Sequence, residues 1–455
     1  MTATTALLSQ FWNSLGGDLS DSHHVLFSGI GVLSCAFAVT DFAAASIGTA
    51  GLAVAELLAL RYGDFPSVRV DSRLSSLWFG TSLRPRGWTL PSPWDPIAGD
   101  YRTSDGWIRL HTNAPEHRAA ALSVLAVQAE QEAVAKAVSE WNAQDLETAI
   151  VERGGCAAVM RSQAEWRAHP QGRSVSAEPL FHVSLAGSGK RPAWPICADR
   201  PLRGIRVLDL TRVLAGPVAT RFLAGLGADV LRIDPPWWNE PGLVPEVTLG
   251  KRCARLDLRD PMQRARFDAL LGQADVLVHG YRSDALDRLG LGAAHRRTLR
   301  PELIDVSLDA YGWAGPWARR RGFDSLVQMS CGIADTGMRN FGRDRPTPLP
   351  VQALDHATGY LMAAAVVRGI TRRLQDGSGL EARTSLARVA CALMDHPASP
   401  DLQPIASQDP TDLASGLERT AWGPAQRLRA PVSISGAPLI WNTPAVALGS
   451  SEPIW

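Results

Sequence analysis

The chain has 455 residues, 45% apolar and 20% charged, a composition typical of a globular protein of two or three domains. Its formal net charge of +1 excludes a global attraction to nucleic acid or an anionic membrane. The six cysteines form no CxxC pair and no zinc-type spacing with histidine, so we expect no metal site and reduced thiols in the cytosol.

Residues 25–60 form a long apolar segment rich in Ala, Leu, Val and Gly. Asp41 lies in its middle and Glu56 near its end, and a carboxylate at the bilayer centre costs roughly 2.5–3.5 kcal/mol. The apolar runs beside Asp41 are shorter than the ~20 residues a span needs. No basic region precedes them, so a signal peptide is not expected either. We predict a buried helix and no membrane span.

The next stretch, residues 81–183, reads as a small α+β domain. YRTSDGWIRL predicts a β-hairpin around Asp105-Gly106. Helical patterns follow at 116–127, 131–141, 147–154 and 159–169. Residues 184–201, rich in Ser, Gly and Pro, predict a linker.

A β–α–β unit occupies residues 203–236. GIRVLDL reads as a buried strand, and the apolar residues after it recur at helical spacing up to Gly227, which closes the helix. DVLRIDPP reads as a second strand, ended by two prolines. Further strands are predicted at 253–258, 274–281 and 302–312, with an amphipathic helix at 261–273. Alternating strands and helices predict an α/β fold with a doubly wound parallel sheet.

Two segments of the chain resemble each other. Asp41 and Asp355 each begin a long helix of small residues, followed by a Gly/Asp turn and a short charged strand. Two Ala-rich helices could look alike through composition alone, but the shared turn and strand favour duplication. The tail, 397–455, is Pro/Ser-rich and weakly periodic, and we expect it to be extended.

Three features could carry chemistry. The turn TRVLAGP after the first strand offers free N–H groups at the start of a helix, where an anion could bind. It lacks the GxGxxG pattern of dinucleotide sites, but Asp234 lies near the position of their ribose-binding acid, so such a site stays an alternative. Basic side chains that could bind phosphate follow several strands, and they are Lys251, Arg252, Arg282, Arg288 and Arg321. Asp355 could be a simple helix cap. The small residues beside it admit a thin ligand, and the Gly359 N–H could serve an oxyanion.

Taken in order, five motifs resemble the family III CoA-transferases (CaiB/BaiF), which include formyl-CoA transferase, carnitine CoA-transferase and α-methylacyl-CoA racemase. The motifs are RPLRGIRVLDLTRVLAGPVATRFLAGLGADVLRIDPP, GKRCARLDLRDP, ADVLVHGYRSDALDRLGL, RPELIDVSLDAYGWAGPWARRRGFDSLVQMSCGIA and LDHATGYLMAAAVVRGITRRLQDGSGLEARTSL, covering 203–386. YRTSDGWIRL also looks like the family's smaller domain, which normally follows the catalytic helix.

The resemblance implies covalent catalysis by Asp355 on acyl-CoA, with a carboxylic acid as acceptor and no covalently bound cofactor at rest. It also implies a binding site for the CoA phosphates and adenine, formed by Arg212, Val213, Ala215, Gly216, Pro217, Lys251, Arg288 and Arg321. The racemases have a His where this chain has Phe323, which disfavours proton abstraction and favours transfer.

The domain order departs from the family pattern, because the small domain comes before the CoA-binding domain and the Asp-headed helix occurs twice. We therefore divide the chain into a degenerate Asp-helix copy (1–80), a small α+β domain (81–183), a linker (184–201), a CoA-binding domain (202–396) and a tail (397–455). Family dimers interlock, so we expect a homodimer or an internal pseudo-dimer. Asp41 is then a second nucleophile or a relic. A racemase of the same fold and a non-catalytic CoA-binding paralogue remain alternatives.

Overall fold

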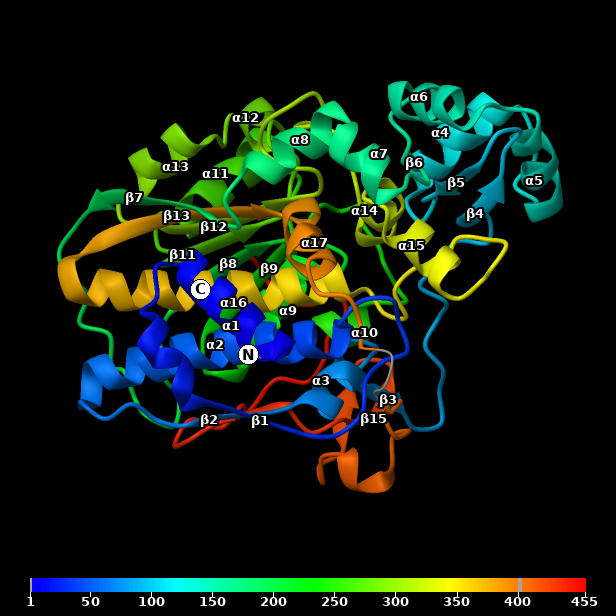
Figure 1. Cartoon of the computed structure of the whole chain (residues 1–455). Helices are drawn as coiled ribbons and strands as arrows, with labels where there is room; N and C mark the ends of the chain where they lie inside the picture. The colour runs from blue at the N-terminus through cyan, green and yellow to red at the C-terminus, as the bar shows by residue number, and fades with distance from the viewer. Residues whose placement is uncertain (1, 400–402) are drawn as a thin grey trace.

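A seven-stranded sheet forms the centre of the computed structural model, which describes residues 2–399 and 403–455 (Figure 1). The strands are β8 (Arg206–Leu210), β9 (Asp229–Asp234), β10 (Arg252–Arg255), β11 (Val276–His279), β12 (Ile304–Asp309), β13 (Ser378–Ser385) and β7 (His182–Ser188). Their order is β10-β9-β8-β11-β12-β13-β7, and only β7 is antiparallel. The sheet is therefore doubly wound, as predicted, and its strand order reverses between β8 and β11.

Both faces of this sheet are buried under helices. Leu208 and Leu210 of β8 point into one core, with α11 (Pro261–Leu271), while Val207 points into the other, with α9 (Ala215–Gly225) and α16 (Ala353–Asp376). The short helices α12 (Ala285–Arg288) and α13 (Ala293–Leu299) lie on the α11 side (Figure 1). The strand and helix patterns of this region are confirmed, because each element buries its apolar residues as its periodicity requires.

Below α16, a second helix and a second sheet complete the layers. Helix α2 (Val39–Tyr62) lies beside α16 in the same direction, and Glu56 of α2 pairs with Arg368 of α16 (Figure 1). The small sheet beneath it has the order β1-β2-β16, formed by β1 (Val25–Ser28), β2 (Val68–Asp71) and β16 (Val432–Ile434). Two long helices are thus enclosed between two sheets.

The two Asp-headed helices have the same construction. Each has 24 residues with Asp as the third, and each ends at a glycine of positive φ. Their N-caps, Ala38 and Gln352, share nearly the same backbone angles (φ −74, ψ 59 and φ −76, ψ 64). Each helix also connects two parallel strands, β1 to β2 and β12 to β13, and the second strand of each pair has an antiparallel neighbour. This shared topology supports duplication more strongly than composition did.

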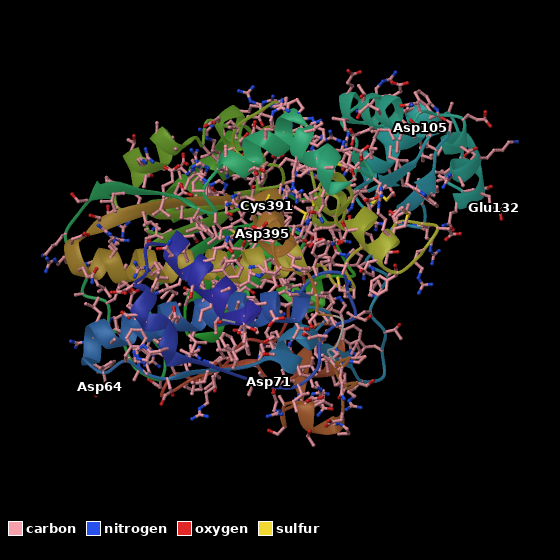
Figure 2. The ribbon with its side chains drawn as sticks, in the orientation of Figure 1. Asp64, Asp71, Asp105, Glu132, Cys391 and Asp395 are labelled. Carbon is pink, nitrogen blue, oxygen red and sulfur yellow. The ribbon has the colours of Figure 1, made fainter. Side chains whose placement is uncertain are left out.

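Each repeat ends in a further short helix capped by a polar side chain. The carboxylate of Asp71 accepts a hydrogen bond of 2.9 Å from Leu74 N–H at the start of α3 (Ser72–Trp78), and Figure 2 shows Asp71 in the lower layer. Ser385 caps α17 (Leu386–Met394) in the same way, through Arg388 N–H. Helix α1 (Ala3–Ser14) and the turn η1 (Leu19–His24) precede the first repeat.

The small domain forms a separate lobe, on which Figure 2 labels Asp105 and Glu132. Its sheet, β4-β5-β6, contains the predicted hairpin, and its helices enclose a core of their own. The elements are β4 (Gly99–Arg102), β5 (Trp107–Leu110), α4 (Pro115–Leu125), α5 (Gln131–Ser139), α6 (Ala143–Glu152) and β6 (Ala157–Val159). Helices α7 (Gln163–Ala168), α8 (Pro170–Ala177), α14 (Asp324–Ser330) and α15 (Ile333–Asn340) lie between this lobe and the large sheet (Figure 1).

Two predictions about connecting segments are wrong. Residues 182–188, placed partly in the linker 184–201, form β7, because a polar strand is tolerated where one face meets solvent at a sheet edge. The tail, expected to be extended, contributes β14 (Glu418–Thr420), β15 (Gly423–Arg427), β16 and the turn η2 (Pro410–Asp412). It pairs with β3 (Leu83–Pro85) and β2, partners far away in sequence that local periodicity does not reveal.

Helix α2 is the one described helix that is long and apolar enough to cross a membrane by length and composition. In the structure 83% of its most apolar 18-residue window is buried inside the protein. The helix therefore packs as a core element, with α1 on one side and α16 on another.

Candidate active site

A cavity of about 430 Å³ opens at the carboxyl ends of β8, β11 and β12, where the strand order reverses. In open α/β sheets this is the place where ligands bind, because the connections diverge and leave a crevice. The turns after the three strands supply most of its wall, and the small lobe supplies Ala114, Glu116 and His117. The cavity therefore lies between the two lobes of the protein.

Asp355 lies on the wall of this cavity as the third residue of α16, with 7% of its surface exposed. Its backbone N–H donates a hydrogen bond of 2.9 Å to Oδ2 of Asp324, and the other carboxylate oxygen, Oδ1, accepts from the Gln328 side chain. Burial, and then the charge of Asp324, raise the pKa of Asp355 well above its usual value. Burial also raises the pKa of Asp324, against the effect of its hydrogen bonds. Two buried carboxyl groups are thus coupled at the head of one helix.

Replacing Asp324 with asparagine should shift the low-pH limb of kcat/KM to lower pH. The amide oxygen can still accept from Asp355 N–H, but the negative charge that opposes ionisation of Asp355 is gone. A raised pKa keeps a nucleophilic carboxylate protonated at low pH, so lowering that pKa extends activity downward. The pH–rate profile measures this. Asp335→Asn, on α15 and outside the cavity, should leave the profile in place, and an Asp324→Asn limb that stays or rises would refute the coupling.

The turn between β8 and α9 forms another part of the wall. Val213 has φ +64, a strained conformation for a β-branched residue, and its N–H donates a hydrogen bond of 2.9 Å to the half-buried Glu240. Ala215 and Gly216, in the first turn of α9, also line the cavity. N–H groups in a first turn have no partner within the helix, so they are available to an anion.

Several arginines line the cavity. Arg212 lies 4.6 Å from the ring centre of Trp238 and 4.9 Å from that of Tyr281. Arg282 and Arg321 line the same cavity, and burial, followed by the charge of Arg321, lowers the pKa of Arg282. No carboxylate of the described chain forms an ion pair with either of these two side chains. A cluster of arginines without an ion-pair partner favours a polyanionic ligand such as a phosphate group.

Three other predicted site residues have different surroundings. Lys251 is fully buried and donates to Asp209 and to the Pro217 carbonyl, each at 3.0 Å, so it supports the start of α9 from below and cannot reach a ligand. Pro217 itself does not line the cavity. Arg288 is 66% exposed and pairs with Asp284, outside the cavity. These three assignments to phosphate binding are corrected.

Gly359 has a packing function. It is the seventh residue of α16, where backbone N–H groups are already used within the helix, so it is not an oxyanion donor. A Cβ at this position would collide with the carbonyl oxygen of Ala215, and the glycine therefore allows α16 and α9 to approach closely. The small residues after Asp355 thus admit a neighbouring helix.

Asp41 lies outside the cavity. It heads α2, and Thr4 of α1 donates a hydrogen bond to its carboxylate. This surrounding fits the interpretation of Asp41 as a relic of duplication better than that of a second nucleophile.

Sequence reasoning missed Asp309 and the contributions of the small lobe. Asp309, at the end of β12, lines the cavity, and burial raises its pKa to about 8. One of its oxygens accepts from Gly312 N–H at 2.8 Å, so the protonated carboxyl group can donate to a ligand at neutral pH. His117 comes from α4, and no sequence spacing connects it to the large sheet. The sequence therefore carried no local signal that His117 belongs to the site.

The fold and the site together define an α/β protein with a ligand cavity at the point where its strand order reverses. A buried carboxyl group and several arginines line this cavity. The chain belongs to the CoA-transferase family III, which it matches over residues 202–429.

Similar proteins carry related names. An acyl-CoA transferase of Gibberella moniliformis (strain M3125 / FGSC 7600) is 29% identical, over 65% of this chain and 56% of its own. Succinyl-CoA:glutarate CoA-transferase of Mus musculus is 32% identical, over 44% of this chain and 49% of its own. A crystal structure of Rv3272 from Mycobacterium tuberculosis is 31% identical over 43% of this chain and 56% of that chain, with a TM-score of 0.40. The chain spans about half the length of the curated relatives it matches.

Proposed function

We propose that the protein is an acyl-CoA:carboxylate CoA-transferase with Asp355 as its nucleophile. The observation that carries the proposal is the position of Asp355, a carboxyl group on the wall of a cavity that is also lined by Arg282 and Arg321. Arg282 and Arg321 suit the phosphates of CoA, and the N–H groups of Ala215 and Gly216 suit an oxyanion or a phosphate oxygen. Family membership and the names of the relatives support the same activity.

The proposed reaction conserves one thioester bond. The Asp355 carboxylate attacks the carbonyl of the donor acyl-CoA and the C–S bond breaks. The CoA thiolate departs, and an acyl–aspartyl anhydride forms on the enzyme. The thiolate then attacks the aspartyl carbonyl, releasing the donor acid and leaving an aspartyl-CoA thioester. The acceptor carboxylate displaces CoA from this thioester, and the thiolate takes up the acceptor acyl group, which frees Asp355. Because a thioester and an acid are exchanged for another such pair, the reaction is nearly thermoneutral.

The carboxyl pair at Asp355 suits this chemistry. A carboxylate with a raised pKa is a stronger nucleophile once ionised, and a buried site excludes the water that would hydrolyse the anhydride. Phe323, which lines the same cavity, has no group that could take a proton from an α-carbon. This difference favours transfer over racemisation within the fold.

Trapping with hydroxylamine tests the proposal. Incubation with an acyl-CoA and hydroxylamine should convert Asp355 to a hydroxamate, because the anhydride and the thioester are both activated forms of the same carboxyl group. Peptide mass spectrometry locates the hydroxamate. Incubation without acyl-CoA is the control. A hydroxamate on the peptide carrying Asp41 would identify Asp41, not Asp355, as the nucleophile. CoA binding without any trapped adduct would favour the non-catalytic alternative.

A further inference from the structure

A second cavity of about 200 Å³ adjoins the one that contains Asp355. The two cavities share four wall residues, which are Ala114, Val213, Trp238 and Phe323, and they therefore meet at a neck. Phe323 is the chain neighbour of Asp324, which binds the Asp355 backbone, so the neck lies close to the proposed nucleophile. At the far end, Gly242 closes against the loop of the small lobe, where an added Cβ would lie 2.8 Å from Pro93 Cα.

The larger part of the wall of this smaller cavity is apolar and aromatic, and Ser92, Asn113 and Asn239 are its uncharged polar residues. Trp94, Trp238, Leu243 and Phe323 contribute large apolar surfaces to it. His111 stacks on Phe323 with ring centroids 3.7 Å apart, and burial, followed by the charge of His117, lowers the pKa of His111 to about 3. This histidine is therefore neutral at physiological pH. The cavity has the lining expected around an uncharged group.

The charged groups at this cavity leave no cation for a ligand. Its two carboxylates, Asp95 and Glu240, are already bound to arginines, Asp95 to Arg118 at 3.3 Å and Glu240 to Arg232 at 2.5 Å. Within the described residues, no lysine or arginine lines the cavity. Arg109 lies over the Trp94 ring at 5.0 Å and pairs with Asp100. A second carboxylate on a ligand here would find no cation on the cavity wall, and burying it unpaired would be costly.

We infer that the smaller cavity holds the acyl group and that the substrates are monocarboxylates with an uncharged chain and the CoA esters of these acids, not dicarboxylates. The inference rests on the proposed function, since it places the acyl group in the cavity that no described arginine lines and the CoA phosphates in the cavity that Arg282 and Arg321 line. The cationic cavity and the neutral one thus divide the substrate at its thioester. The mouse relative, in contrast, is named for two dicarboxylates.

Two CoA esters of equal chain length test this division. Butyryl-CoA and succinyl-CoA differ only in the terminal group, so the ratio of their kcat/KM values reports on the charge tolerance of the acyl site. With acetate as a common acceptor, butyryl-CoA should be favoured at least about tenfold. Equal values, or a preference for succinyl-CoA, would overturn the inference while leaving the transferase function in place. If neither ester acylates Asp355 in the hydroxylamine experiment, both proposals fail.

A cation placed in the smaller cavity should reverse the preference. Leu243 is partly exposed, so Leu243→Arg can introduce a guanidinium at the wall without burying it fully. Leu243→Gln, a polar side chain without charge, is the matched control. The arginine variant should raise relative activity toward succinyl-CoA about tenfold or more, and the glutamine variant should not. An unchanged ratio in Leu243→Arg, with hydroxamate trapping at Asp355 retained, would show that the acyl group lies elsewhere.

Discussion

Asp355→Asn is expected to reduce kcat for CoA transfer by at least about three orders of magnitude. The amide cannot form the anhydride, and no described carboxylate other than Asp309 and Glu116 lines the same cavity to take its place. The fold should tolerate the change, because asparagine has nearly the size of aspartate and burial, which raises the pKa of Asp355, already opposes its charged form. Steady-state kinetics with a fixed donor and acceptor, together with an unfolding curve, measure both effects.

Asp41→Asn is the matched control for this experiment. Asp41 holds the same position in a helix of the same length but contacts Thr4 instead of the cavity. Its replacement should leave kcat within about twofold of the wild type. A large loss in Asp41→Asn with full activity in Asp355→Asn would reverse the assignment of nucleophile and relic. Equal losses in both would indicate a shared site.

The architecture around Asp355 was predictable because it depends on local patterns. The strand β8, the helix α9 and the strand β9 each carry the periodicity of their own structure, and the glycine after α9 ends that helix. Parallel pairing then places the ends of the strands at one edge of the sheet, so the turn containing Arg212 and the helix headed by Asp355 meet there. The chemistry of these positions followed from the resemblance to the family.

The direction of individual side chains was not predictable. Lys251 follows a turn just as a phosphate ligand would, yet it points inward to Asp209, because β8 provides a buried carboxylate that requires a partner. Arg288, in contrast, points to the surface. It ends a helix of only four residues, and its partner there is Asp284, one turn earlier in the chain. Whether a basic residue neutralises the core or meets a ligand is decided by contacts distant in sequence.

The contribution of the small lobe was also beyond sequence reasoning. Its hairpin and helices were predicted, but nothing local says that the residues after β5 and at the start of α4 turn toward Phe323. The tail was missed for the same reason, since β15 and β16 are too short to show a pattern alone and are stabilised by β3 and β2. Long-range pairing supplies the stability that short strands lack.

A buried ion network holds this tail against the large domain. Glu246, in α10 (Val244–Val247), pairs with Arg221 of α9 and, at 3.2 Å, with Arg427 of β15. It also accepts hydrogen bonds from Ser82 Oγ at 2.6 Å and from Leu83 N–H at 3.0 Å. Burial alone would raise the pKa of Glu246, but the two arginines outweigh it and lower the pKa to about 2. The stabilisation is thus present above the ordinary pKa of 4.5 and is lost as the pH falls toward 2.

Glu246→Ala should lower the free energy of unfolding by about 3–5 kcal/mol, because it leaves two buried arginines without their shared partner. Urea unfolding followed by tryptophan fluorescence at pH 7 measures the loss, and at a pH below the native pKa of Glu246 the difference from wild type should shrink. Asp257→Ala, which breaks the exposed pair with Arg259, is the control and should have no measurable effect. Equal losses in the two variants would mean that burial adds nothing to this network. A loss confined to Glu246→Ala, with limited proteolysis now cutting the tail first, would show that Arg427 attaches residues 410–446 to the domain that carries the active site.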